Sequence, residues 1–351
     1  LANGEAIASN PPHAVHGGKT PWLYLGPMDD RPDDLRRLLT LNALPCRKKP
    51  LYWRLSDHVF VRPYLENLCF GRWNYPLGVT LFGLLQTSRM LHRKDIEDYV
   101  LQHLTACVSL HEYSLWDEQT YGFSEINAQL VHMHMLDDCG SFGALMLEAA
   151  GDSPDESTLS VAHRIADHML YHQERKPDGA FYRKLEGYFM ENTLWVDDLY
   201  MSIPFLIRYS RLTQDERYLE DAVHQFLLYR QYLFMKEQAV MSHVYDFKYG
   251  TPTRIPWGRG NGWCLFSLAE LLSILPDNHS SFSELRSFFN QLCRGYTALQ
   301  AQSGLWHQVL TRPDAYEESS CTAMFVYAFC RGLRLGLIEP DLRSTVAASA
   351  E

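Results

Sequence analysis

Apolar side chains recur along the chain in two alternating kinds of helical segment. Five segments are apolar or small-residue-rich on all sides, and they begin at intervals of roughly 60 residues: 78–91, 140–151, 199–212, 262–275 and 321–336. Four segments between them carry one charged and one apolar face: 94–110, 155–172, 215–234 and 281–300. A helix with one wet face suits an outer layer, and an apolar helix suits an inner layer. The pattern therefore predicts repeated helical hairpins that close into a double-layered α/α barrel.

The predicted fold class is all-α, an (α/α)6 barrel with short β-hairpins on one rim. The hairpins are expected from three alternating runs ahead of inner helices: 178–185, 239–250 and 303–313. A sixth inner helix is not visible, because one period before Gly78 falls in an irregular stretch that contains prolines. We expect residues 1–50 to form an irregular N-terminal arm packing on the barrel, and residues 51–351 to form a single α/α-barrel catalytic domain.

Composition narrows the classes of partner. The chain has 351 residues, 46% of them hydrophobic, and a formal net charge of -10 without any long run of Lys or Arg. Nucleic acid is therefore not an expected partner, and no apolar stretch is long enough for a membrane span. Eight cysteines without a CxxC pair indicate reduced, buried thiols and a cytoplasmic protein. The chain begins with Leu1, which leaves secretion open as the alternative, and the oligomeric state is not set by the sequence.

The segments just before the inner helices are expected to meet around one cavity, because parallel inner helices place their N-termini at one end. These segments are 72–78, 132–140, 195–198, 257–263 and 316–321. They carry aromatic residues, acids and Arg259, and the positive ends of helix dipoles point toward the same place. Aromatic faces stack on sugars, and an arginine pairs with a carboxylate. The sequence therefore predicts a pocket for a negatively charged ring.

Two aspartates stand out in this cavity. Asp137 and Asp197 hold equivalent positions in successive repeats, so we expect them to face each other across the cavity mouth. Two close carboxylates in a partly dry site raise the pKa of one of them, which keeps a proton available for general acid catalysis. Asp138, Asp198 and the run 317–320 are instead expected to cap helices.

Two further readings concern binding. Core packing and sugar contact are equally open for three aromatic residues: Trp73, Tyr75 and Tyr316. His132, His134 and Asp137 form only a weak metal-ligand pattern, since no further ligand spacing supports it. We therefore expect no bound metal ion. The sequence also contains no nucleophile motif.

The chain resembles the unsaturated rhamnogalacturonyl hydrolases of glycoside hydrolase family 105, close relatives of the family 88 unsaturated glucuronyl hydrolases. The resemblance spans residues 73–337 through an ordered set of motifs: WNYPLGVTLFGLL, WVDDLYMSIPFL, SHVYDF, WGRGNGW, GLWHQVL and YEESSCTAMFVYA. It implies an (α/α)6 barrel and hydration of the C4=C5 double bond on a non-reducing-end unsaturated uronic acid. The substrate would be a small lyase-generated oligosaccharide, with an unsaturated rhamnogalacturonan disaccharide first, and no cofactor.

The resemblance also implies roles for single residues. Asp197, in the W-x-D-x-L-Y-M motif, would be the general acid and base, and Asp137 would orient the sugar and tune Asp197. Asp198 would cap the helix or brace its neighbour. The implied substrate contacts are Trp195, His243, Arg259 and Trp263. Trp73 and Tyr75 are further candidates for substrate contact from their place in the segment 72–78.

Two other functions remain open from the sequence. An inverting glycosidase could use Asp137 and Asp197 on a saturated uronide, and an inactive relative could bind carbohydrate through the same aromatic residues. Unsaturated glucuronyl ends from ulvan, arabinogalactan or glycosaminoglycans are alternative substrates. Beyond Leu337 the family's final hairpin is not recognisable, which leaves the outer wall of the cavity and the length of the substrate undefined.

Overall fold

The computed structural model describes residues 22–23, 64–65, 72–122, 124, 126–338 and 342. The chain divides into two compact units, which are taken one at a time: residues 1–133 with 149–161 form the first, and residues 134–148 with 162–351 the second. The expected sixth inner helix and most of the expected arm, residues 1–50, lie outside the described residues. A single domain over residues 51–351 stays a prediction.

The first unit is a set of consecutive helices with a short strand pair. Its elements are β1 (Trp22–Leu23), antiparallel to β2 (Tyr64–Leu65), and the helices α3 (Tyr75–Leu91), α4 (Lys94–Ser109), α5 (His111–Tyr121) and α6 (Ala128–His132). Helix α3 begins where sequence chemistry dictates: Asn74 accepts the Leu77 N–H at 3.0 Å, and Pro76, which has no N–H to satisfy, follows in the first turn. Helices α5 and α6 are absent from the predicted pattern, because neither has a long apolar face.

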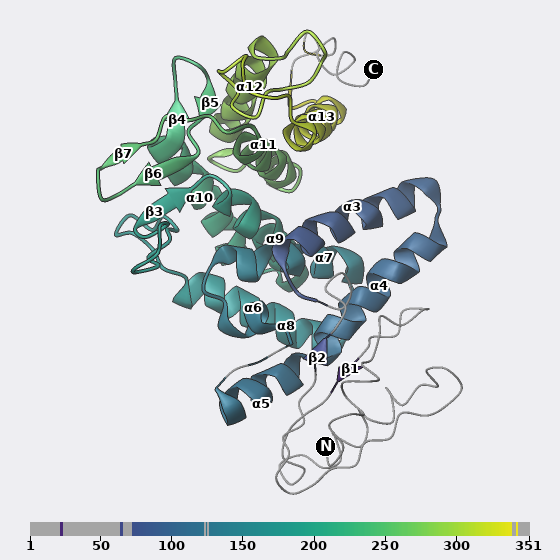
Figure 1. Ribbon diagram of the computed structural model, residues 1–351. Coiled ribbons are helices and arrows are strands. Elements are labelled where there is room, and N and C mark those ends of the chain that lie inside the picture. Colours follow the sequence, from purple (N-terminus) through teal and green to yellow (C-terminus); the bar gives the residue numbers. More distant parts are fainter. Residues whose placement is uncertain are drawn as a thin grey trace, which may run out of the picture. The chain divides into compact units, whose positions relative to one another are not determined.

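The second unit alternates inner and outer helices, as the pattern predicts (Figure 1). Its inner helices are α7 (Gly140–Ala150), preceded by the 3-10 turn η1 (Leu136–Asp138), α9 (Asp198–Thr213), α11 (Gly258–Leu272) and α13 (Ser319–Arg334). The outer helices are α8 (Glu156–Asp167), which belongs to this unit from residue 162 on, with the π-helical turn η2 (His168–His172), α10 (Glu216–Leu233) and α12 (Phe282–Ala298). Helix α9 packs on α10 and α11, and α11 packs on α12 and α13.

A buried ion network joins the C-terminal halves of the four inner helices. Arg208 of α9 donates to Glu148 of α7 at 2.9 Å and to Glu270 of α11 at 2.7 Å. Glu270 also forms an ion pair with Arg331 at 3.1 Å and accepts from the Tyr327 hydroxyl at 2.8 Å, both on α13. Buried charges are tolerated only when they are paired in this way. The network therefore fixes which ends of these helices lie together.

Glycine allows α7 and α9 to cross closely. A Cβ at Gly140 would lie 1.6 Å from the carbonyl oxygen of Met201 and 2.9 Å from the Met169 side chain. No rotamer change relieves an overlap with backbone, so α7 can begin here only with a residue that lacks a side chain. This crossing positions the turn that precedes α7 beside α9.

The strands of the second unit are short. β3 (Thr193–Trp195), β6 (Val244–Asp246) and β7 (Thr251–Pro252) form an antiparallel sheet in the order β3-β6-β7, with Trp195 opposite Val244. β4 (Phe234–Met235) pairs with β5 (Val240–Met241).

The prediction of three β-hairpins is only partly correct. The run 239–250 supplies β5 and β6, but these pair with different strands. The runs 178–185 and 303–313 make isolated bridges, such as Arg183 with Thr193 and Trp257 with Val309. Alternation marks a half-buried extended segment, and it does not specify the partner of that segment.

Two further expectations from the sequence concern the cysteines and the absence of a membrane span. The six cysteines that the structure describes are all free, and five are buried, as predicted. Within the same residues, every helix falls short of the length and apolarity that crossing a membrane requires.

We expect Gly140→Ala to lower the free energy of unfolding by about 3 kcal/mol, because the added methyl overlaps backbone in a packed interior. Gly83 in α3 is the matched control, since its Cβ would meet nothing within 4 Å. Gly83→Ala should raise stability by about 0.5–1 kcal/mol through helix propensity. Urea denaturation measures both, and equal effects of the two substitutions would contradict the close crossing.

Candidate active site

The paired acids Asp197 and Asp198 stand between β3 and α9. The Val196 N–H donates to the His243 carbonyl at 2.9 Å, so the pairing of β3 with β6 extends to the start of α9. Asp197 is the N-cap residue, but neither carboxylate caps the helix, so that expectation is wrong. Asp197 already has helical backbone angles, φ −58° and ψ −34°, whereas a capping side chain reaches back from an extended residue. Both carboxylates are consequently available for other contacts.

Asp198 forms a buried ion pair with Arg183. The guanidinium donates through Nε to Asp198 Oδ2 at 3.2 Å and through Nη2 to Oδ1 at 2.6 Å. Both side chains are almost fully buried. This forked geometry is the strongest arrangement for an arginine and a carboxylate. Asp198 therefore anchors Arg183.

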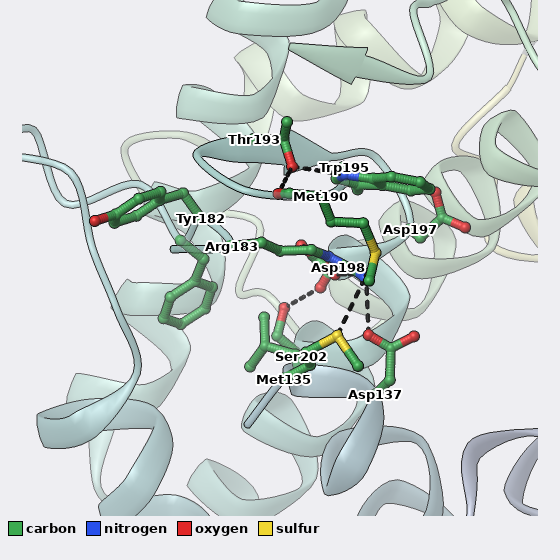
Figure 2. A network of polar contacts seen from close by, with 12 residues as sticks. Met135, Asp137, Tyr182, Arg183, Met190, Thr193, Trp195, Asp197, Asp198 and Ser202 are labelled. Atoms are coloured by element: carbon green, nitrogen blue, oxygen red, sulfur yellow. Dashed lines mark hydrogen bonds and ion pairs between the residues drawn. The ribbon is translucent and has the colours of Figure 1, made fainter. Parts of the chain in front are cut away.

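Arg183 also holds Asp137, as Figure 2 shows. Its Nη2 donates to Asp137 Oδ2 at 2.9 Å, and its guanidinium carbon lies 5.0 Å from the Trp195 ring centroid. The Nη1 group contacts the sulfur atoms of Met135 and Met190. Sequence reasoning missed Arg183, because its pairing with Thr193, two residues before Trp195, is seen only in the structure.

The carboxylates of this cluster have shifted pKa values. Burial raises the pKa of Asp198 to about 6, against the lowering effect of Arg183. Burial also raises the pKa of Asp137, and the nearby charge of Asp197 raises it further, while Arg183 again acts in the opposite sense. Desolvation and like charge both disfavour a carboxylate. Asp137 and Asp197 are therefore close enough for their charges to interact, and their facing each other across a cavity mouth stays a prediction.

Asp197 is hydrogen-bonded to His243. The distance from His243 Nε2 to Asp197 Oδ2 is 3.0 Å. The imidazole ring is held between two tryptophans, with ring centroids 4.7 Å from Trp195 and 4.6 Å from Trp257. Its backbone N–H donates to the Ile255 carbonyl at 2.8 Å. His243 can therefore share a proton with Asp197 while its orientation stays fixed.

Arg259 continues this wall at the start of α11. Its guanidinium lies 4.5 Å from the Trp257 ring centroid, and Nη1 donates to Glu318 Oε1 at 2.8 Å. Glu318 also accepts from the Ser320 hydroxyl, so its side chain does not cap α13, contrary to expectation. The Arg259 side chain keeps 42% of its surface exposed. It can meet an anionic ligand with the donors that Glu318 does not use.

The remaining predicted residues divide by location. Trp263 is buried against Tyr200, with ring centroids 4.2 Å apart. Trp73 is buried in the first unit and Tyr75 is 38% exposed there; substrate contact by Trp73, Tyr75 and Trp263 stays a prediction.

Two expectations about other residues are decided. Of the two alternatives left open for Tyr316, core packing is excluded, because 61% of the residue is exposed. Asp138 does take a capping role, since it accepts the Met135 N–H at 3.0 Å.

A cavity of about 240 Å³ adjoins the Arg183–Asp198 pair, but neither Asp197 nor His243 lines it. Arg183, Asp198, His134 and Tyr182 are among its lining residues. Across the described part of the chain, no three His, Cys, Asp or Glu side chains are grouped as metal ligands would be. The local chemistry is that of acids, one histidine, two arginines and aromatic faces, which suits proton transfer to a bound, anionic sugar.

Comparisons with solved structures define the fold. A possible member of the GH105 family from Salmonella enterica superposes with a TM-score of 0.66 at 21% identity, covering 85% of this chain and 73% of that one. The unsaturated glucuronyl hydrolase from Bacillus sp. GL1 gives 0.60 at 15%, covering 82% and 74%. The chain therefore has the α/α-barrel fold of these enzymes, which confirms the predicted fold class.

Sequence comparison gives the family. The chain belongs to Glycosyl Hydrolase Family 88, whose family model matches residues 64–350. It is 29% identical over 254 residues to the unsaturated rhamnogalacturonyl hydrolase YesR of Bacillus subtilis, covering 72% of this chain and 68% of that protein. It is also 29% identical to an unsaturated 3S-rhamnoglycuronyl hydrolase of Alteromonas, of which it spans only 40%. The resemblance seen in the motifs is confirmed.

We expect Arg183→Met to raise the pKa values of Asp198 and Asp137 by about one unit or more, because the lost cation stabilised both carboxylates. Carboxyl carbon NMR titration measures these pKa values directly. Arg183→Lys keeps the charge and should give a smaller rise. Arg259→Met is the control for loss of an arginine elsewhere, and it should leave Asp198 unchanged. An unaltered Asp198 pKa in Arg183→Met would contradict the assigned ion pair.

Proposed function

We propose that this chain hydrates the C4=C5 double bond of an unsaturated uronic acid at the non-reducing end of a lyase-generated oligosaccharide. The neighbouring sugar is released as a result. The observation that carries the proposal is the 3.0 Å contact between Asp197 and His243 beside a second acid, Asp137, that Arg183 holds in place. Membership of Family 88 and the names of the relatives support the same chemistry.

Asp197 acts as general acid and base in this proposal. It gives a proton to C4, and the attacking water gives a proton back to Asp197 while its oxygen bonds to C5. The product is a hemiketal at C5, and the net change is addition of one water across the double bond. Breaking the bond between C5 and the ring oxygen gives a C5 ketone and a hemiacetal at C1. Collapse of that hemiacetal leaves an aldehyde and frees the neighbouring sugar.

The other residues serve binding and proton control. Arg259 meets the uronate carboxylate with its exposed donors, and the aromatic faces of Trp195 and Trp257 border the ring. His243 orients Asp197 and shares its proton. Asp137, whose pKa is raised, binds a sugar hydroxyl and limits the negative charge next to Asp197. The proposed mechanism uses only side chains of the protein and no cofactor.

The favoured substrate is an unsaturated rhamnogalacturonan disaccharide. The Bacillus subtilis relative is named as an unsaturated rhamnogalacturonyl hydrolase, and it matches this chain over 254 residues, 72% of its length. The Alteromonas relative is named for a 3S-rhamnoglycuronyl substrate, which makes unsaturated uronyl-rhamnose with a sulfate the second candidate. Both candidates place rhamnose next to the unsaturated uronate.

Loss of the ultraviolet absorbance of the C4=C5 chromophore tests the proposal. The protein is mixed with unsaturated disaccharides from rhamnogalacturonan, ulvan and chondroitin lyases. We expect loss of absorbance with a rhamnose-containing disaccharide and a fall of at least about 100-fold in kcat for Asp197→Asn, as for loss of a general acid.

Asp277→Asn is the matched control, since Asp277 is an exposed loop aspartate between α11 and α12. It should keep full activity. If the absorbance stayed constant with every unsaturated substrate while a saturated uronide was cleaved, a conventional inverting glycosidase would replace the proposal. Full activity of Asp197→Asn, together with loss of activity in Asp198→Asn, would show that Asp198 carries the chemistry and that the proposal names the wrong aspartate.

A further inference from the structure

A loop beside the candidate site presents two aromatic side chains to solvent. The loop, residues 184–192, is closed at its base by the bridge between Arg183 and Thr193, where the Arg183 N–H donates to the Thr193 carbonyl at 2.7 Å. At its tip, 67% of Tyr188 and 81% of Phe189 are exposed. A single exposed ring is ordinary, but two adjacent exposed rings form a small apolar patch.

The loop is held in place at several points. The Tyr188 N–H donates to the Leu185 carbonyl at 3.0 Å, and the Glu191 carboxylate accepts the Gly187 N–H at 3.1 Å. Lys248 donates to the Glu191 carbonyl at 2.9 Å. These bonds fix the tip without covering it.

The loop is also tied to the carboxylate cluster. Arg183 contacts the Met190 sulfur with the same guanidinium that binds Asp137 and Asp198. The Thr193 hydroxyl donates to the Met190 carbonyl and accepts the Trp195 indole N–H at 2.8 Å. The exposed ring is therefore presented in a fixed position relative to the site.

Phe189 lies at the outer end of a line of rings that begins at the reacting carboxylate. Asp197 bonds to His243, the His243 ring is 4.7 Å from Trp195, and the Trp195 ring is 6.3 Å from Phe189 in an edge-to-face contact. Tyr188, next to Phe189 in the chain, makes no ring contact with this line among the described residues. Of the two exposed rings, Phe189 is thus the one continuous with the site.

We propose that Phe189 is the stacking platform for the sugar that is released, the neutral residue next to the unsaturated uronate. This inference rests on the proposed function. A phenyl ring offers an apolar face and no hydrogen bond, so it favours the C–H face of a neutral sugar, and the methyl group of a 6-deoxyhexose such as rhamnose adds to the contact. Arg259 binds the charged uronate in this proposal, so Arg259 and Phe189 contact different sugars of the substrate.

The test compares two substrates that share the uronate. One is the unsaturated uronyl-rhamnose disaccharide, and the other is the methyl glycoside of the same unsaturated uronate, which has no second sugar. Phe189→Ala should lower kcat/KM on the disaccharide by about tenfold, the loss expected when one ring face is no longer covered. On the methyl glycoside, Phe189→Ala should change kcat/KM by less than about twofold, as for a surface substitution that does not contact the substrate.

Two variants in the same loop serve as controls. Tyr188→Ala removes an equally exposed neighbouring ring and should leave both values unchanged. Phe189→Tyr keeps the ring face and should retain the activity on the disaccharide.

The inference fails if Phe189→Ala has the same kcat/KM on the disaccharide as the unchanged protein. It also fails if the substitution lowers kcat/KM equally on both substrates, since an equal loss means that Phe189 acts only through Trp195. An equal loss in Tyr188→Ala would also overturn it, because the effect would then belong to the loop as a whole. If the unchanged protein leaves the absorbance of both substrates constant, the proposed function itself is wrong, and the inference falls with it.

Discussion

The parallel alignment of the inner helices is the constraint on which the site depends. In the second unit the ion network of Arg208 and Glu270 joins the C-terminal halves of α7, α9, α11 and α13. The residues just before the same helices meet at the other end, through Arg183 on one side and through His243, Trp257 and Arg259 on the other. A helix with reversed direction would break both sets of contacts. The fold therefore brings together residues that are distant in sequence.

Charge balance determines what the gathered acids can do. Arg183 is one buried cation facing Asp137 and Asp198, with Asp197 close by. Because burial disfavours uncompensated charge, one guanidinium cannot hold all three acids ionised at equal cost. Asp198 takes the forked pairing, Asp137 shares the same nitrogen and has a raised pKa, and Asp197 turns to His243 instead. Three adjacent acids thus have three different environments, which is the usual basis for separate roles in acid–base catalysis.

The sequence predicted the helical layers well, because apolar periodicity records burial, and α9 and α11 begin within a few residues of the expected positions. The repeat pattern also predicted that Asp137 and Asp197 share one site, and the family resemblance added His243. The sequence did not reveal Arg183, since an arginine in a short extended run is usually a solvent-exposed residue. The capping roles of Asp198 and Glu318 were wrong for a related reason: local preference favours a cap, but an arginine from a distant segment binds each carboxylate. Such tertiary pairing leaves no local pattern in the sequence.

The most direct test of the central claim, hydration of the double bond, is an NMR analysis of the products formed in deuterated water. Addition of water across C4=C5 places solvent deuterium on C4 of the uronate product and converts C5 to a ketone. The account predicts a single deuterium at C4, added to one face, together with release of the neighbouring sugar. A released uronate that still contains the double bond and carries no deuterium at C4 would contradict the account, because the glycosidic bond would then have been hydrolysed directly.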